Sequence, residues 1–342
     1  MIEINLLSGQ RVLLIAPAFF GYETEIQYEL ERRGAIVDRL LDRPFSTAIM
    51  KALARFSRAL VMPAADRYFH SALDRLTGQY DLALVISGQT LSRRVIRRIK
   101  KDNPGIRMYL YMWDSLGNRP AARKNFFLYD RVLTFDRQDA DAHGLNFRPL
   151  FYGAGFIEIP NVPPSITYSF IGTAHTDRYA VMNAIKEQAP AHTTSFIYYF
   201  LHAPWVFHVQ KIVNPAFREA KLSEFSFVPL SKSKVWSIFQ SSRIIVDIEH
   251  PRQTGLTMRT IEAFGAGKKL ITTNADIETY DIFDPHNVLI IDRTNPKIPD
   301  DYFLTPARPP NPDLKYKYSI VGWMDDILGR SEEARPDTMG VA

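Results

Sequence analysis

Short apolar runs alternate with segments of helical periodicity along the first 150 residues of the chain. The apolar runs lie at 11–16 (RVLLIA), 35–38, 81–87 (DLALVIS), 107–112 (RMYLYM) and 130–135 (DRVLTF). Runs that are apolar at nearly every position are typical of strands buried on both faces of a parallel sheet. The segments predicted to be helical are 23–33, 46–61, 66–76, 92–101 and 136–143. This alternation predicts βαβ units and an α/β fold.

A segment rich in Pro and Gly, residues 153–166, interrupts the alternation, and we place a domain boundary there. A second alternation follows it. Its strands are predicted at 168–171, 194–201, 225–228, 243–248, 268–273 and 287–292, and its helices at 177–188, 205–213, 231–240 and 256–264. The pattern therefore predicts an N-terminal domain over 1–155, a C-terminal domain over 166–305 and an amphipathic final helix over 315–329.

The stretch from Arg243 to Asn274 has the clearest organisation in the chain. A β-branched run precedes a polar loop, His250–Gly255, and a helix follows until Gly265 and Gly267 end it. In a parallel sheet such a loop lies at the carboxyl end of a strand, where these folds bind ligands. The free N–H groups at the start of the helix would suit a phosphate.

Composition excludes several classes of site. The chain has no Cys, which excludes disulfides, thiolate metal sites and a cysteine nucleophile, and suits a reducing compartment. The N-terminus has no basic region before its apolar run, so we expect no signal peptide. No uncharged apolar run approaches about 18 residues, the length that a membrane span needs. We therefore expect a cytoplasmic protein.

Charge is distributed unevenly. Residues 1–150 hold 23 Lys and Arg against 16 Asp and Glu, whereas the remainder holds 19 against 21. Two basic segments, 49–60 and 92–101, could lie on an anionic membrane, on the inner face of the plasma membrane; the alternative for the first is a core-packed surface helix. A nucleic-acid partner is not expected, because the interleaved aromatics and Gly-rich strands of common RNA modules are absent.

Several motifs resemble bacterial glycosyltransferases of the GT-B fold that build lipopolysaccharide or capsule. The resemblance lies in residues 250–274 with YDIF at 280–283 and NVLIIDR at 287–293. Further pieces resemble the same group: YMWDSLGN (111–118), residues 129–152, SFIGTAHTDR (169–178) and VPLSKSKVW (228–236). The resemblance extends from about residue 80 to residue 293, and the first 80 residues match only in general layout.

The resemblance implies two Rossmann-like domains whose parallel sheets face a central cleft, with the final helix crossing back to the N-terminal domain. It implies that the C-terminal domain binds a nucleotide-sugar donor and that the N-terminal domain binds a glycan or lipid-linked acceptor. It also implies that no metal or other cofactor is needed, because helix dipoles and basic side chains neutralise the leaving diphosphate.

The resemblance assigns donor contacts to residues around the His250–Gly255 loop. Glu262 would accept the ribose hydroxyls; the alternative is a solvated helix acid. The other candidates for contact with phosphate or sugar are Arg178, His250, Gln253, Thr254, Gly255, Leu256, Thr257 and Arg259. Alternatives are capping of the helix by Thr254 or Thr257, an ion pair of Arg259 with Glu262, and a surface position for Arg178.

One departure from the family pattern bears on the mechanism. Retaining members often carry two Glu separated by seven residues, and Thr254 stands where the first Glu is expected. This absence favours inversion, which needs a general base for the acceptor hydroxyl. Asp114, which follows a strand and lies beside Trp113, is the first candidate, and the indole would desolvate its carboxylate. Glu23 is the second. A non-catalytic relative that binds a nucleotide or glycan is the alternative function.

Overall fold

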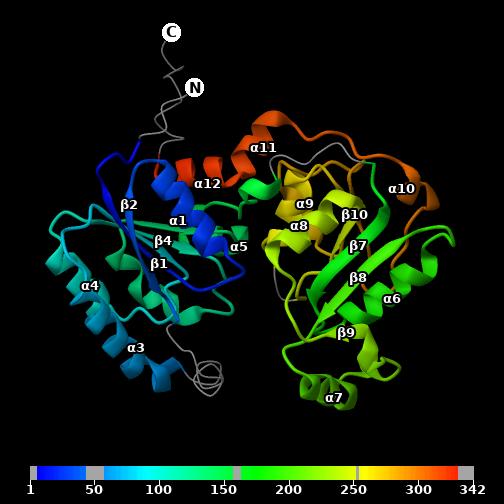
Figure 1. The fold of residues 1–342 in the computed structure, drawn as a ribbon, viewed down its shortest axis with the longest axis horizontal. Helices are drawn as coiled ribbons and strands as arrows, with labels where there is room; N and C mark the ends of the chain where they lie inside the picture. The colour runs from blue at the N-terminus through cyan, green and yellow to red at the C-terminus, as the bar shows by residue number, and fades with distance from the viewer. Residues whose placement is uncertain (1–5, 44–57, 157–162, 252–253, 330–342) are drawn as a thin grey trace, which may run out of the picture. The chain divides into compact units, whose positions relative to one another are not determined.

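The computed structural model describes residues 6–43, 58–156, 163–251 and 254–329, which form two compact α/β units (Figure 1). The first unit contains the chain up to Pro149 together with the segment from Ile320 onwards, and the second contains Leu150–Ser319. The division therefore falls just before the segment rich in Pro and Gly. No described helix is long and apolar enough to cross a membrane.

The N-terminal unit is built on a six-stranded sheet in which every pairing is parallel. Its strands are β1 (Arg11–Ala16), β2 (Ile36–Leu41), β3 (Leu82–Ile86), β4 (Arg107–Met112), β5 (Arg131–Thr134) and β6 (Asn146–Phe147). Their order in the sheet is β2-β1-β3-β4-β5-β6, so the direction of winding reverses between β1 and β3. The helical segments are α1 (Tyr22–Arg32), α3 (Arg58–Leu73), α4 (Arg93–Asp102), η1 (Pro120–Leu128) and α5 (Arg137–His143).

The C-terminal unit repeats this plan with a different strand order. Its strands are β7 (Ile166–Thr173), β8 (Ser195–Phe200), β9 (Phe225–Ser226), β10 (Ser242–Asp247), β11 (Lys269–Thr272) and β12 (Val288–Ile290). The order β12-β11-β10-β7-β8-β9 is entirely parallel and reverses between β7 and β10. Its α-helices are α6 (Arg178–Gln188), α7 (Pro204–Val213), α8 (Lys232–Ser241), α9 (Met258–Gly265), α10 (Asp300–Leu304) and α11 (Pro312–Tyr318).

The central strands confirm what their apolar runs predict. All five residues of β3 are buried, and so are five of the six in β1. Their side chains and those of α3 and α4 form the core of the N-terminal unit. Because both faces of these strands are covered, every position along them must be apolar.

The predicted break between a helix at 46–61 and a helix at 66–76 is wrong. A single helix, α3, runs from Arg58 to Leu73 and continues through Pro63. Val61, Ala65 and Phe69 are spaced four residues apart and are buried together, so tertiary packing outweighs the local cost of the proline. Residues 44–57, which hold most of the basic segment predicted at 49–60, lie outside the described residues.

The final helix predicted over 315–329 is two helices, α11 and α12 (Ile320–Ile327), separated by Ser319 in an extended conformation. The expectation that the last helix returns to the N-terminal domain is confirmed, because α12 belongs to that unit. Buried Arg33 donates to Asp325 Oδ1 at 2.5 Å and to the Val321 carbonyl at 2.8 Å. The Trp323 ring lies 5.0 Å from that of Tyr111, measured between centroids.

Candidate functional site

The topology of the C-terminal sheet defines the edge at which we expect a ligand. Because β7, β10, β11 and β12 are parallel, their carboxyl ends meet at one edge. Doubly wound sheets bind ligands at this edge, where the winding reverses. Here the reversal lies between β7 and β10, so the loops that follow these two strands flank it. The polar loop predicted from the sequence is one of the two.

Helix α9 begins two residues later than predicted because Thr257 caps it. Thr257 Oγ1 accepts from the Thr260 amide at 3.2 Å and donates to Asp247 Oδ2 at 2.5 Å. Thr260 Oγ1 donates to the same carboxylate oxygen at 2.6 Å. Asp247, the last residue of β10, is buried, so these hydroxyls satisfy its charge. The capping alternative for Thr257 therefore occurs in this structure.

Glu262 and Arg259 form the ion pair that their spacing allows. Arg259 Nη1 lies 2.8 Å from Glu262 Oε2, and the guanidinium lies 5.0 Å from the centre of the Phe239 ring. Glu262 is only 2% exposed, so it is not a solvated helix acid. In this structure its carboxylate is bound within the protein.

Arg178 connects the two strands at the reversal point instead of lying on the surface. Its Nε donates to the Ile248 carbonyl at 2.6 Å and its Nη1 donates to the Thr173 carbonyl at 3.0 Å. Burial lowers the pKa of Arg178 from its ordinary value, and nearby Asp247 and Glu249 oppose that shift. The guanidinium is thus held at the junction of the β7–α6 and β10–α9 loops.

Two histidines meet at the same junction. The ring centroids of His175, after β7, and His250, after β10, lie 5.6 Å apart. Burial lowers the pKa of His175 to about 4, with further lowering by Arg178 and His250. His175 is therefore a neutral imidazole near pH 7, able to donate or accept a hydrogen bond without adding charge.

The remaining predicted residues of the loop have different surroundings. Gly255 and Leu256 are buried, and Thr254 is half-buried with its carbonyl accepting from the Asn274 side chain at 3.3 Å. Gln253 lies outside the described residues. The loop is thus anchored at its second half, next to the start of α9.

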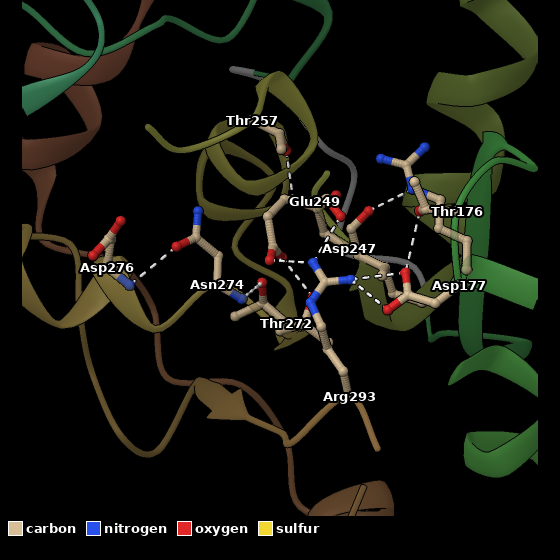
Figure 2. Close-up of polar contacts among 12 residues, drawn as sticks. Thr176, Asp177, Asp247, Glu249, Thr257, Thr272, Asn274, Asp276 and Arg293 are labelled. Atoms are coloured by element: carbon tan, nitrogen blue, oxygen red, sulfur yellow. Dashed lines mark hydrogen bonds and ion pairs between the residues drawn. The ribbon is translucent and has the colours of Figure 1, made fainter. Parts of the chain in front are cut away.

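A network centred on Arg293 was not recognised from the sequence (Figure 2). Arg293 Nη1 lies 2.9 and 3.0 Å from the two carboxylate oxygens of Asp177, and Nη2 donates to the Glu249 carbonyl at 2.7 Å. Arg293 also pairs with the Glu249 carboxylate, whose other oxygen accepts from Thr273 Oγ1 at 2.5 Å. One guanidinium thus joins the loops after β7, β10 and β12. Position was the available signal for Glu249 and Arg293, which each follow the last residue of a predicted strand, whereas Asp177 begins a predicted helix.

The N-terminal unit has a pocket at its own point of reversal, beyond β1 and β3. Phe19, Tyr22 and Trp113 line it, with ring centroids 5.8 to 6.4 Å apart. Both predicted general bases, Glu23 and Asp114, line the same pocket. The structure therefore brings together two carboxylates that are far apart in the sequence.

The two carboxylates differ in their contacts. Asp114 Oδ2 lies 3.0 Å from Arg119 Nε and 3.2 Å from Gln89 Nε2, and 40% of the Asp114 side chain is exposed. The desolvated surroundings expected beside Trp113 are therefore replaced by partial exposure and an ion pair. Glu23 Oε2 accepts from the Phe19 amide at 3.0 Å, which closes the β1–α1 loop.

Backbone strain marks the same loops in both units. Among the described residues, the non-glycine positions with positive φ are Phe20 (51°), Ser87 (66°) and Thr176 (55°). They follow β1, β3 and β7, which are strands at the points of reversal. Such conformations cost on the order of 1–3 kcal/mol each and cluster at binding sites. The strain therefore supports a functional role for these edges.

Comparison with protein-family models and with curated proteins finds no match to this chain. Among solved structures, Anabaena HepE in complex with UDP and glucose is similar, with a TM-score of 0.58 and 11% identity over 95% of this chain and 100% of HepE. The UDP-forming trehalose-phosphate synthase of Burkholderia xenovorans has a TM-score of 0.59 and 10% identity, over 95% of this chain and 100% of the synthase.

A UDP-N-acetylglucosamine 2-epimerase is also similar, with a TM-score of 0.50 and 12% identity over 98% of this chain and 100% of the epimerase. At these identities the likeness concerns the fold. The expected GT-B fold, with two Rossmann-like α/β domains, is confirmed.

Proposed function

We propose that this protein is a glycosyltransferase that moves a sugar from a nucleotide-sugar donor to a hydroxyl group of an acceptor. The observation that carries the proposal is the pair of strained, polar edges, one at the point of reversal of each sheet. The fold likeness to HepE, whose structures hold UDP with glucose and UDP-glucose, supports a donor of this class.

In this proposal the donor binds at the β7/β10 edge of the C-terminal unit. Backbone N–H groups of residues 254–257, with Arg178 and Arg259, bind the diphosphate, and His250 and Gln253 contact phosphate or sugar. Glu262 accepts the ribose hydroxyls. Donor binding then exchanges the Arg259–Glu262 pair for two charge-assisted contacts with the ligand, one for each partner.

The acceptor binds in the N-terminal pocket, where aromatic rings offer apolar surface to a sugar. Asp114 removes the proton of the acceptor hydroxyl, with Glu23 as the second candidate. The acceptor oxygen attacks the anomeric carbon as the bond to the diphosphate breaks, and the nucleoside diphosphate leaves with the electron pair. This displacement inverts the anomeric centre. Arg119 and Gln89 orient the Asp114 carboxylate.

A surface-polysaccharide or lipid-linked acceptor is the proposed class, and the basic face of α4 supports it. Asp102, at the end of this helix, and Asp74 pair with Arg98, and Asp130 pairs with Lys100. None of these pairs involves the three exposed cations Arg94, Arg97 and Lys101. Their spacings of three and four residues place them on one face of the helix. This face would bind an anionic leaflet, at about 1 kcal/mol per cation.

Thermal unfolding with UDP, GDP, dTDP and CMP and with their sugars tests the proposal. A ligand at 100 times its dissociation constant stabilises the protein by about 2.7 kcal/mol. We expect one nucleotide family to raise the melting temperature, and its sugar to be transferred to an acceptor. The absence of any shift would reject the donor site. Binding without turnover would favour a non-catalytic relative, and conversion of the donor without an acceptor would favour an epimerase.

A further inference from the structure

Asp42 is a fully buried carboxylate directly after the last residue of β2. Its backbone N–H donates to the carbonyl of Ala16, the last residue of β1, at 3.0 Å. Its side chain is 0% exposed, and burial raises the pKa of its carboxyl group. A buried carboxylate costs free energy unless the protein supplies hydrogen-bond donors to it. Packing alone therefore does not explain why an acid occupies this position.

The donors to Asp42 come from the loop that follows β3. Asp42 Oδ2 accepts from the backbone N–H of Gln89 at 2.8 Å, and Oδ1 accepts from the backbone N–H of Thr90 at 3.0 Å. Thr90 Oγ1 adds a longer contact to Oδ1 at 3.4 Å. An asparagine in this arrangement would present its NH2 group to one of the two N–H groups, so that two donors would meet. The contact with two successive N–H groups therefore requires a carboxylate.

The loop that Asp42 binds begins with a strained turn. Ser87 and Gly88, directly after β3, have φ angles of 66° and 58°. Strained backbone persists only where the surrounding structure holds it in place. Asp42 binds the next two residues, and it thereby joins the end of β2 to the point of reversal between β1 and β3.

Gln89 connects this loop to the proposed general base. Asp42 binds its backbone N–H, and its side-chain Nε2 lies 3.2 Å from Asp114 Oδ2. We propose that Asp42 is a positioning residue for sugar transfer: it fixes the backbone of Gln89 so that the Gln89 side chain orients the Asp114 carboxylate. A catalytic group keeps its geometry only when the residues that contact it are themselves fixed. This inference rests on the proposed function, in which Asp114 is the base.

The first test observes the side-chain NH2 group of Gln89 by NMR in full-length protein that contains isotopically labelled glutamine. Gln89→Met identifies the signal, because it removes it. Asp114→Asn should move the signal, because the charged acceptor is lost, and Asp42→Asn should move it comparably. Thr90→Val is the matched control. It removes the third contact of the Asp42 carboxylate and keeps both backbone N–H groups, so the Gln89 signal should stay in place.

Steady-state kinetics measure the consequence for transfer. Asp42→Asn and Gln89→Met should each lower kcat about tenfold, because a misplaced catalytic group slows the chemical step. The KM of the donor should stay unchanged, because the proposed donor site lies in the other unit. The double variant should lose no more than Asp42→Asn alone, since both substitutions remove one contact with Asp114. Thr90→Val should keep the wild-type kcat.

A wild-type kcat in Gln89→Met would overturn the proposal, whether or not Asp42→Asn folds. An unmoved Gln89 signal in Asp42→Asn would also overturn it. So would an Asp42→Asn protein that loses only melting temperature, because Asp42 would then have a structural role alone. If wild-type protein transfers no sugar, the proposed function fails, whereas the NMR comparison, which needs no substrate, still decides whether Asp42 positions Gln89.

Discussion

The two points of reversal occupy equivalent places in the two sheets and carry opposite chemistry. At the N-terminal one, the carboxylates of Glu23 and Asp114 line a pocket among aromatic rings. At the C-terminal one, Asp177, Asp247 and Glu249 are bound by an arginine and by threonine hydroxyls of the protein itself. In the N-terminal unit both acids line a pocket, where Asp114 pairs with Arg119 and Glu23 accepts from the Phe19 amide, whereas in the C-terminal unit Asp247 and Glu249 are buried.

This difference agrees with the division of the proposed reaction between the two units. A carboxylate that lines a pocket can exchange a proton with a bound hydroxyl, which suits the acceptor side. On the proposed donor side, the groups that would meet an anion are the guanidinium of Arg178, held by the Ile248 and Thr173 carbonyls, and the neutral imidazole of His175. In the proposed reaction, one edge thus serves proton transfer and the other serves diphosphate binding.

The largest effect is expected from Asp114→Asn. Loss of the general base should lower the rate of transfer about 10²- to 10⁴-fold, while the dissociation constant of the donor stays unchanged. Steady-state kinetics and calorimetric titration measure the two quantities. Glu23→Gln is the matched control in the same pocket. If that variant loses the rate and Asp114→Asn keeps it, the base is Glu23.

Arg293→Gln tests whether the acids of the C-terminal edge are structural. Removing the guanidinium leaves the buried Glu249 carboxylate without its cation, and we expect a loss of about 3 kcal/mol in the free energy of unfolding, measured in urea. Arg308→Gln is the control, because that pair is 3.9 Å long and Arg308 is 65% exposed, so the loss should stay below about 0.5 kcal/mol. Equal losses would contradict a special role for Arg293.

Substitutions at two helix caps, one near each edge, should lower the free energy of unfolding by smaller amounts. Thr257→Ala removes the cap of α9 and a hydrogen bond to buried Asp247, so it should cost about 2 kcal/mol of unfolding free energy. Ser92→Ala removes only the cap of α4, where Ser92 accepts from the Val95 amide, and should cost about 1 kcal/mol. A larger loss for Ser92→Ala would mean that Asp247 does not depend on Thr257.

The pH dependence of the free energy of unfolding tests whether His175 is neutral in the folded protein. The pKa of His175 is about 4 in the folded protein and about 6.5 unfolded, so the unfolded chain binds more protons between these values. The contribution of neutral His175 to the free energy of unfolding is therefore complete above pH 6.5 and declines as the pH falls toward 4. The loss from pH 7 to pH 6 should be less than about 1 kcal/mol, because His175 is only half-buried.

His175→Gln should make that decline shallower. The charges of Asp177, Arg178 and Arg293 also act on His175, so the comparison is between the slopes of the two proteins and not between absolute stabilities. Parallel slopes would show that folding does not lower the pKa of His175.

The smallest effect is expected from removing divalent metal ions. If basic side chains and backbone N–H groups of the C-terminal edge neutralise the diphosphate, EDTA should leave the transfer rate unchanged within about twofold. If EDTA abolished transfer and Mg²⁺ or Mn²⁺ restored the rate, these groups would be insufficient to neutralise the diphosphate. The experiment measures the rate of sugar transfer in metal-free buffer and again after each ion is added back.

Local pattern was sufficient for the central strands, and insufficient for the edge strands β2 and β6 and for the helix boundaries. The runs in β1, β3 and β4 identify buried parallel strands because two covered faces require apolar residues throughout. The predicted division between 46–61 and 66–76 is absent, because α3 continues through Pro63 and buries Val61, Ala65 and Phe69. The division of the final helix at Ser319 had no local signal, since it coincides with the boundary between the two units.

The candidate residues were recognised individually, and their environments were not. The Arg259–Glu262 pair and the cap at Thr257 follow from spacing along one helix, so the sequence contains both. Arg293 contacts residues 116 and 44 positions away, and nothing local indicates that its partners are Asp177 and Glu249. Contacts of this kind depend on strand order, which the sequence did not specify.

The amino-acid sequence by itself determined the class of fold, the two α/β units and the stretch from Arg243 to Asn274 as a strand, polar loop and helix. These features depend on periodicity, which neighbouring residues set. Only the tertiary structure decided which carboxylates face a pocket, which are bound by the protein, and that Asp42 binds the loop after β3. Those properties depend on which strands become neighbours and which loops meet at their ends, and both follow from packing between segments distant in the chain.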